Sequence, residues 1–160
     1  AVRQNNLINI KRESMDNNTK NIKKNKTFSK KIAKLEYKSV AYISEGFYTL
    51  KVEFFDNKLN INVKGSCYEF NLKTERNKKF IQSILDDLNK LHIENWEDYY
   101  DLPFPYMVTD LHSWEIKLTY EDKKVKEING YAVHPSNWED FEKILQKLIP
   151  LETIKKYLIF

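Results

Sequence analysis

One stretch, residues 110–149, constrains the fold most, because it contains a complete strand–turn–strand–helix unit. Apolar and polar residues alternate over 114–120, which is the period of a half-buried strand. A polar turn at 121–123 and a weaker strand at 125–130 then predict a β-hairpin. Ser136 and Glu139 have the Ser-x-x-Glu spacing of a helix capping box. One apolar helical face follows, made of Trp138, Phe141, Ile144, Leu145, Leu148 and Ile149.

An earlier part of the chain follows the same plan. Alternating runs at 49–55, 59–63 and 68–72 predict strands, after a first strand that begins near Tyr37. Thr74 is the expected N-cap of an amphipathic helix that ends near Leu91. A further short helix is expected where Phe28, Ile32 and Leu35 recur at helical spacing. We therefore predict a pseudo-repeat of two hairpin–helix units, 37–91 and 110–149.

These patterns favour an α+β fold. A strictly alternating strand has one buried face, and each predicted helix has one apolar stripe. The economical arrangement is an antiparallel sheet of two repeated hairpin–helix units with both helices packed on one face. A chain of 160 residues suits one such domain, expected at 27–160, with a basic arm at 1–26.

The arm is expected to be flexible or ordered only by a partner, because it contains few apolar residues. Residues 1–35 carry ten Lys or Arg against two acidic residues, whereas the rest of the chain is mildly acidic. Three interpretations stay open: contact with nucleic acid, docking on an acidic protein face, and a solubilising tail. The candidate contacts are Lys20, Lys23, Lys24, Lys26, Lys30, Lys31 and Lys34.

Composition and motifs disfavour several classes. The sequence has no apolar run of about 18 residues and no apolar signal-peptide core at its start. Cys67 is the single cysteine, which excludes an intrachain disulfide and fits a reducing, cytoplasmic location. The sequence lacks a glycine-rich phosphate loop, His-Glu-x-x-His, Gly-x-Ser-x-Gly and Cys-x-x-Cys. We therefore expect a protein that is not an enzyme and has no cofactor.

Acidic and aromatic residues alternate in the connector between the two units, at 92–109. Aromatic side chains are enriched at binding hot spots, and a carboxylate-rich face can occupy a groove built for phosphates. We expect Trp96 and Tyr99 to lie in the core. The neighbouring residues Glu97, Asp98, Tyr100 and Asp101 are then candidates for binding a partner protein.

The open end of the second hairpin brings two histidines together. Pairing across the 121–123 turn places His112 near His134, with Asp110 close by. A metal ion held by these three groups, and a metal hydrolase built on it, is one interpretation. The other is that both imidazoles flank strand ends in solvent, and on that interpretation no metal is expected. His112, Tyr131 and His134 join the candidate partner contacts.

The pattern from Trp96 onward resembles a widespread, mostly uncharacterised domain of low-GC Gram-positive bacteria and their mobile elements. Leu111 stands where that pattern has Gly, and Ala132 stands where it has Asn. The resemblance covers roughly residues 37–149 and implies architecture only, since the domain has no assigned catalytic residues. The matching residues are Asn95, Trp96, Tyr99, Tyr100, Asp110, Trp114, Tyr120, Gly130, Pro135, Asn137 and Phe141.

By type, although not by motif, the chain is also similar to small phage-encoded inhibitors such as anti-CRISPR proteins. We therefore expect a non-enzymatic, phage- or mobile-element-encoded protein that binds a host defence nuclease, such as a CRISPR effector, and blocks it sterically. The alternative is a nucleic-acid-associated accessory protein that uses the basic arm. The metal hydrolase at Asp110, His112 and His134 is the third hypothesis.

Overall fold

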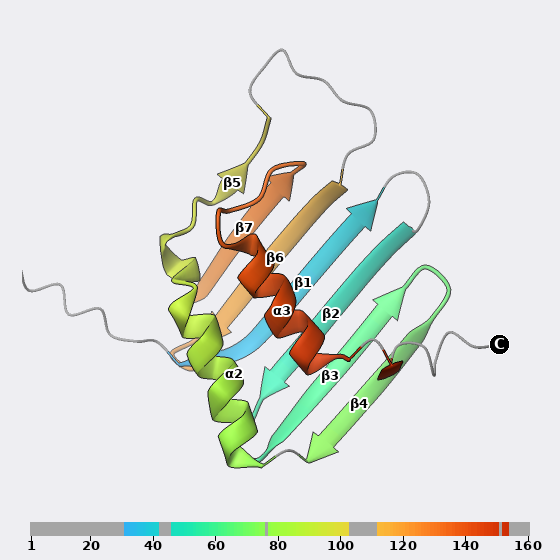
Figure 1. Ribbon diagram of the computed structural model, residues 1–160, viewed down its shortest axis with the longest axis vertical. Helices are drawn as coiled ribbons and strands as arrows, with labels where there is room; N and C mark the ends of the chain where they lie inside the picture. The colour runs from blue at the N-terminus through green and yellow to red at the C-terminus, as the bar shows by residue number, and fades with distance from the viewer. Residues whose placement is uncertain (1–30, 42–45, 76, 103–111, 151, 154–160) are drawn as a thin grey trace, which may run out of the picture.

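The computed structural model describes residues 31–41, 46–75, 77–102, 112–150 and 152–153, and Figure 1 shows their arrangement. The strands are β1 (Ile32–Ala41), β2 (Gly46–Phe54), β3 (Lys58–Gly65), β4 (Glu69–Glu75), β5 (Tyr99–Tyr100), β6 (His112–Tyr120) and β7 (Val125–Tyr131). The helices are α2 (Lys78–Lys90), the short 3₁₀ helix η1 (Ile93–Asn95) and α3 (Trp138–Leu148). None of the described helices is long and apolar enough to span a membrane.

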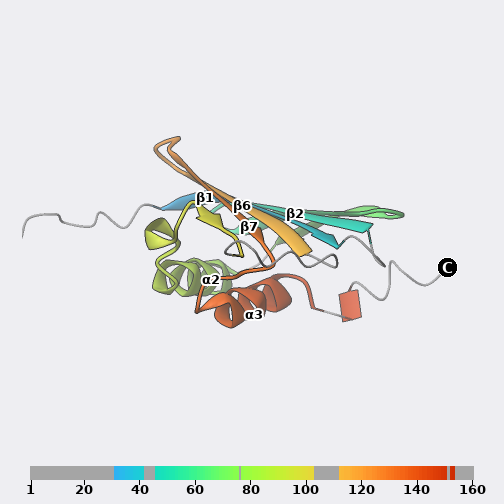
Figure 2. The same ribbon diagram turned by 90° about the horizontal axis from the view of Figure 1, so that it is seen from above.

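The strands form a seven-stranded sheet in the order β4-β3-β2-β1-β6-β7-β5. Every neighbouring pair is antiparallel except β5 and β7, which are parallel. Both α2 and α3 lie under the same face of the sheet (Figure 2). The structure thus confirms the predicted α+β class and a mostly antiparallel sheet with two helices on one face.

The core lies between the sheet and the helices. Strand residues at alternate positions, such as Leu50 and Val52, are fully buried against apolar helix residues, of which Phe141 is also fully buried. Burying each such side chain stabilises the fold by roughly 1.5–3 kcal/mol. The opposite face of the sheet is polar, and on it Glu36 contacts Lys34 and Lys51 at 3.1 and 3.9 Å.

The predicted short helix near Leu35 is wrong where the structure describes it. Residues 32–41 form β1, the central strand, in which Tyr37 lies opposite both Leu50 and Ile116. The register between β1 and β6 shifts between Ile32 and Lys34. This irregularity turns both Ile32 and Leu35 to the buried face although they are three residues apart. A strand therefore acquired the apolar spacing of a helix.

Both predicted helix caps are also wrong. Thr74 lies within β4, and the N-cap of α2 is Asn77, whose Oδ1 accepts a hydrogen bond from the Phe80 amide at 2.7 Å. The N-cap of α3 is Asn137 and not Ser136, and it makes no side-chain capping bond. Instead the Asn137 amide group donates to the Leu91 carbonyl at 3.0 Å. This residue therefore joins the end of α2 to the start of α3.

The two segments predicted as repeated hairpin–helix units differ in structure. A three-stranded meander, β2–β3–β4, precedes α2, whereas the two-stranded hairpin β6–β7 precedes α3. Because β1 pairs with both β2 and β6, the units lie on either side of a shared strand.

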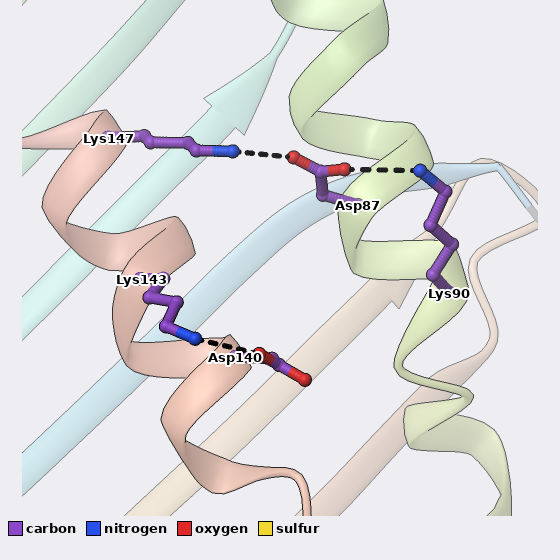
Figure 3. Close-up of polar contacts among 5 residues, drawn as sticks. All are labelled: Asp87, Lys90, Asp140, Lys143 and Lys147. Carbon is purple, nitrogen blue, oxygen red and sulfur yellow. Dashed lines mark hydrogen bonds and ion pairs between the residues drawn. The ribbon is translucent and has the colours of Figure 1, made fainter.

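A surface ion pair links the two helices (Figure 3). Lys147 Nζ of α3 lies 3.0 Å from Asp87 Oδ2 of α2, and Lys90 approaches the other carboxylate oxygen at 3.5 Å. The hydrogen bond from Lys147 is the main cause that lowers the pKa of Asp87. Its neighbour Asp86 is exposed and accepts a hydrogen bond from Gln82 at 2.8 Å. Both carboxylates thus lie on the helix surface.

Candidate partner-binding edge

The connector after η1 forms the outer edge of the sheet beyond β7. In β5, Tyr99 lies opposite Asn129 and Tyr100 opposite Gly130. The Asn129 amide also donates to the Asp98 carbonyl at 3.0 Å. These backbone contacts hold the connector side chains at fixed positions along the edge, which favours binding without a large ordering cost.

The two adjacent tyrosines lie on opposite faces of the sheet. Tyr99 is 61% exposed, so its predicted place in the core is wrong. Tyr100 is half-buried with its ring 5.8 Å from that of Trp114, and its hydroxyl accepts from the Glu97 amide at 3.1 Å. Successive strand residues point to opposite faces, so the choice of register decides which tyrosine is free. The prediction of a buried Trp96 is confirmed.

Gly130 makes room for the aromatic layer beneath this edge. It lies directly across from Trp114, and a Cβ at position 130 would overlap the indole ring. The ring is 1% exposed, and its Nε1 donates to the Val133 carbonyl at 3.0 Å. The glycine therefore allows a tryptophan to lie flat over β7 at the point where β5 pairs.

The three predicted carboxylates of the connector are all exposed. Asp98 forms an ion pair with Lys126, whose Nζ also donates to the Trp96 carbonyl at 2.9 Å. Asp101 accepts from the Leu102 amide at 2.7 Å and from the Tyr99 hydroxyl at 3.4 Å. We call Glu97, Asp98, Tyr99 and Asp101 the acidic edge. Lys126 neutralises one of its carboxylates, so the edge as a whole stays negative.

Shallow depressions flank the acidic edge on both sides. On the helix side, three predicted site residues, Glu97, Tyr100 and His134, line a groove of about 510 Å³ together with Trp96 and Asn137. On the open face, Tyr131 and Tyr99 line a smaller hollow of about 230 Å³. A partner that grips this edge can therefore insert side chains on either side of it.

The structure brings His112 and His134 together, as the sequence predicts, with ring centroids 5.7 Å apart. His112 Nε2 lies 2.5 Å from Ser39 Oγ. The His134 ring stacks on that of Trp114 with centroids 5.7 Å apart and lies tilted against that of Trp138 with centroids 4.5 Å apart. Both rings are partly buried rather than free in solvent.

Burial favours the neutral form of both histidines. Desolvation lowers the pKa of His112, and desolvation followed by the neighbouring His112 lowers the pKa of His134. The carboxylate of Glu142 opposes this change at both rings. The Nε2 atom of His134 is buried without a hydrogen-bond partner. The two rings thus pack mainly against their own neighbours, and their role as partner contacts stays a prediction.

The metal hypothesis gains no support from this geometry. Asp110 lies outside the described residues, and within the described residues no group of three His, Cys, Asp or Glu could hold a metal ion. Cys67 is exposed in the turn between β3 and β4.

Two of the basic candidates lie at the start of the sheet, Lys31 directly before β1 and Lys34 within it. Lys31 Nζ lies 3.0 Å from Glu121 and 3.5 Å from Asp56, and the hydrogen bond to Glu121 is the main cause that raises its pKa. Lys34 pairs with Glu36 at 3.1 Å. Each is therefore already matched with a carboxylate. The candidates Lys20, Lys23, Lys24, Lys26 and Lys30 lie outside the described residues.

Sequence reasoning missed Lys126 and Ser39. Lys126 lies on the same, inward-facing side of β7 as Ile128 and Gly130. A charged residue at such a position predicts a nearby group of opposite charge, which here is Asp98. The contact between Ser39 and His112 depends on the pairing of β1 with β6, for which the sequence carries no local signal.

Comparison with known proteins gives no family to which this geometry can be referred: no protein-family model matches the sequence, and no curated protein is significantly similar to it.

Proposed function

We propose that this chain is a non-enzymatic, protein-binding inhibitor that uses its acidic edge to occupy a basic groove of a partner. The partner class we propose is a host defence nuclease such as a CRISPR effector, in which basic grooves hold the phosphates of nucleic acid. Inhibition is steric: the rigid sheet and helices fill or cover the groove.

The observation that carries the proposal is the fixed, exposed combination of carboxylates and an aromatic ring at one sheet edge. Glu97 and Asp101 are exposed, and the Tyr99 ring between them is 61% exposed. Carboxylates complement Arg and Lys side chains, and the planar fork of Arg binds either a phosphate or a carboxylate through two hydrogen bonds. A large exposed aromatic ring supplies the apolar anchor typical of a hot spot.

The local charge also supports the proposal that the partner binds at this edge. Four carboxylates lie between positions 94 and 101, and the connector itself contains no lysine or arginine there. Such a local excess of one sign steers a basic partner toward this edge and raises the association rate. That rate would fall as salt screens the charges.

The test compares two triple variants in a DNA-cleavage assay with a purified CRISPR effector nuclease and its guide RNA. The edge variant is Glu97→Gln/Tyr99→Ala/Asp101→Asn, which leaves Asp98 to pair with Lys126. The control variant, Glu53→Gln/Phe55→Ala/Asp56→Asn, removes the same charge and a 44%-exposed aromatic ring near the β2–β3 turn, away from β5 and β7. We expect the control to inhibit cleavage like the unmodified protein and the edge variant to lose inhibition.

The nucleic-acid alternative requires a separate deletion. Because β1 begins at Ile32 and Lys31 is ion-paired, the deletion must stop at residue 30 to leave the sheet intact. If the arm hypothesis is right, deletion of 1–30 abolishes DNA binding while the domain stays folded. Retained DNA affinity would count against it, and lack of inhibition by the full chain would count against the inhibitor proposal.

A further inference from the structure

We infer that β4 is the interface of a homodimer, in which the β4 strands of two copies pair antiparallel about a twofold axis at Asn71. β4 ends the described sheet on the side opposite the acidic edge, so the inference is independent of the proposed function. It lies along the margin of the sheet in Figure 1, beyond α3. An edge strand presents unpaired N–H and C=O groups that act as a template for another strand.

The hairpin geometry defines which backbone groups of β4 point outward. Gly65 N donates to the Tyr68 carbonyl at 2.8 Å, so these two residues form a hydrogen-bonded pair at the turn. Hydrogen-bonded and non-hydrogen-bonded pairs alternate along an antiparallel ladder. The register of β3 and β4 places Lys64 opposite Glu69 and Asn62 opposite Asn71, both at non-hydrogen-bonded positions. The N–H and C=O groups of Glu69, Asn71 and Lys73 therefore point away from β3.

The sequence of β4 favours pairing with itself in one register. In this register Asn71 of one copy lies opposite Asn71 of the other, and Glu69 of each copy lies opposite Lys73 of the other. The residues whose backbone groups point outward then face one another across the interface. With the axis at Leu72, Glu69 of one copy would lie opposite Glu75 of the other. With the axis at Lys73, the two Lys73 residues would lie opposite each other. Opposite charges therefore select the Asn71 register.

The same register continues both faces of the sheet across the interface. Phe70 and Leu72 meet on the helix side, where Phe70 is 6% exposed and Leu72 is partly buried against the core. Glu69 and Asn71 lie on the polar side, where both side chains accept from Asn62 Nδ2, at 3.2 and 2.7 Å. A twofold axis normal to the sheet keeps the helices of both copies on one side, so apolar residues meet apolar ones and polar residues meet polar ones.

The first test is a charge reversal followed by sedimentation equilibrium of the full chain. We expect a reversible dimer of the unmodified protein, and Glu69→Lys or Lys73→Glu alone should raise its dissociation constant roughly tenfold, because two cross-strand pairs become like-charged. The double variant Glu69→Lys/Lys73→Glu exchanges the charges and should restore the dimer. A dimer that ignores all three variants would overturn the inference.

The second test addresses the backbone. Asn71→Pro removes an outward N–H, which an edge strand tolerates, and should abolish the dimer, whereas the matched control Asn71→Ala keeps the N–H and should preserve it. Thermal melts check that both variants are folded. A monomer at all soluble concentrations would overturn the inference.

Discussion

Gly130→Ala tests the packing on which the acidic edge depends. The new Cβ would overlap the indole ring of Trp114. That ring cannot move outward without cost, since it is 1% exposed, lies 4.5 Å from Trp138 and donates a hydrogen bond to Val133. The substitution should therefore destabilise the whole domain and not the edge alone.

The expected magnitude follows from three contributions. Overpacking of this kind costs about 3 kcal/mol, and losing the indole hydrogen bond costs about 1 kcal/mol. Replacing glycine by alanine restricts the unfolded chain and returns about 0.7 kcal/mol. The free energy of unfolding should thus fall by about 3 kcal/mol, which lowers Tm by roughly 6–12 °C for a domain of this size.

Urea unfolding followed by tryptophan fluorescence measures this loss. The matched control is Gly65→Ala, whose Cβ would meet the ring of the half-buried Tyr68 at the β3–β4 turn. A partly exposed ring can swing aside more easily, so the control should cost about 1 kcal/mol. If Gly130→Ala changes stability by less than the control, the proposed packing of Trp114 over β7 is wrong.

Three further perturbations test other parts of the fold. Phe141→Ala should lower the free energy of unfolding by about 3–5 kcal/mol in urea titrations, because the fully buried ring leaves a cavity beside Tyr37; a loss under 1 kcal/mol would contradict this. Because the folded-state pKa values of His112 and His134 lie below the ordinary value of 6.5, the unfolded chain binds protons first. Stability should therefore be complete above pH 6.5 and fall as the pH drops toward the folded-state pKa values, by at most about 1.4 kcal/mol per pH unit for each ring; a flat profile from pH 7 to 5 would refute it. A double-mutant cycle of Asp87→Asn with Lys147→Ala should give a coupling of only about 0.2–1 kcal/mol, since the pair is exposed, and coupling above 2 kcal/mol would contradict that reading. Because the Asp87 pKa is lowered in the folded state, this contribution is present above the ordinary carboxyl pKa and is lost as the pH falls through the folded value.

Much of the fold could be predicted because its signal is local. Alternation predicted the strands that contain Leu50 and Ile116, and the apolar stripe from Trp138 to Ile149 predicted α3. The prediction failed at Ile32, where a register irregularity produced helical spacing within a strand. It also failed at Asn137, because that side chain is committed to a distant carbonyl that no local cap pattern reveals.

The candidate site could be predicted only in part. The exposure of the carboxylates Glu97 and Asp101 follows from composition. Which of Tyr99 and Tyr100 is buried does not, since both residues fit an edge strand equally well. Only the pairing of Tyr100 with Gly130 decides which ring packs on Trp114. Long-range register of this kind is set by the whole sheet and not by neighbouring residues.

The most direct measurement of the central claim is the concentration of protein needed to halve cleavage by the CRISPR effector nuclease, compared between the two triple variants. If the acidic edge is the binding surface, Glu97→Gln/Tyr99→Ala/Asp101→Asn should raise this concentration roughly tenfold or more. Glu53→Gln/Phe55→Ala/Asp56→Asn should leave it unchanged within about twofold, as expected for residues outside the interface. Equal inhibition by both variants would show that the partner binds elsewhere and would contradict the account.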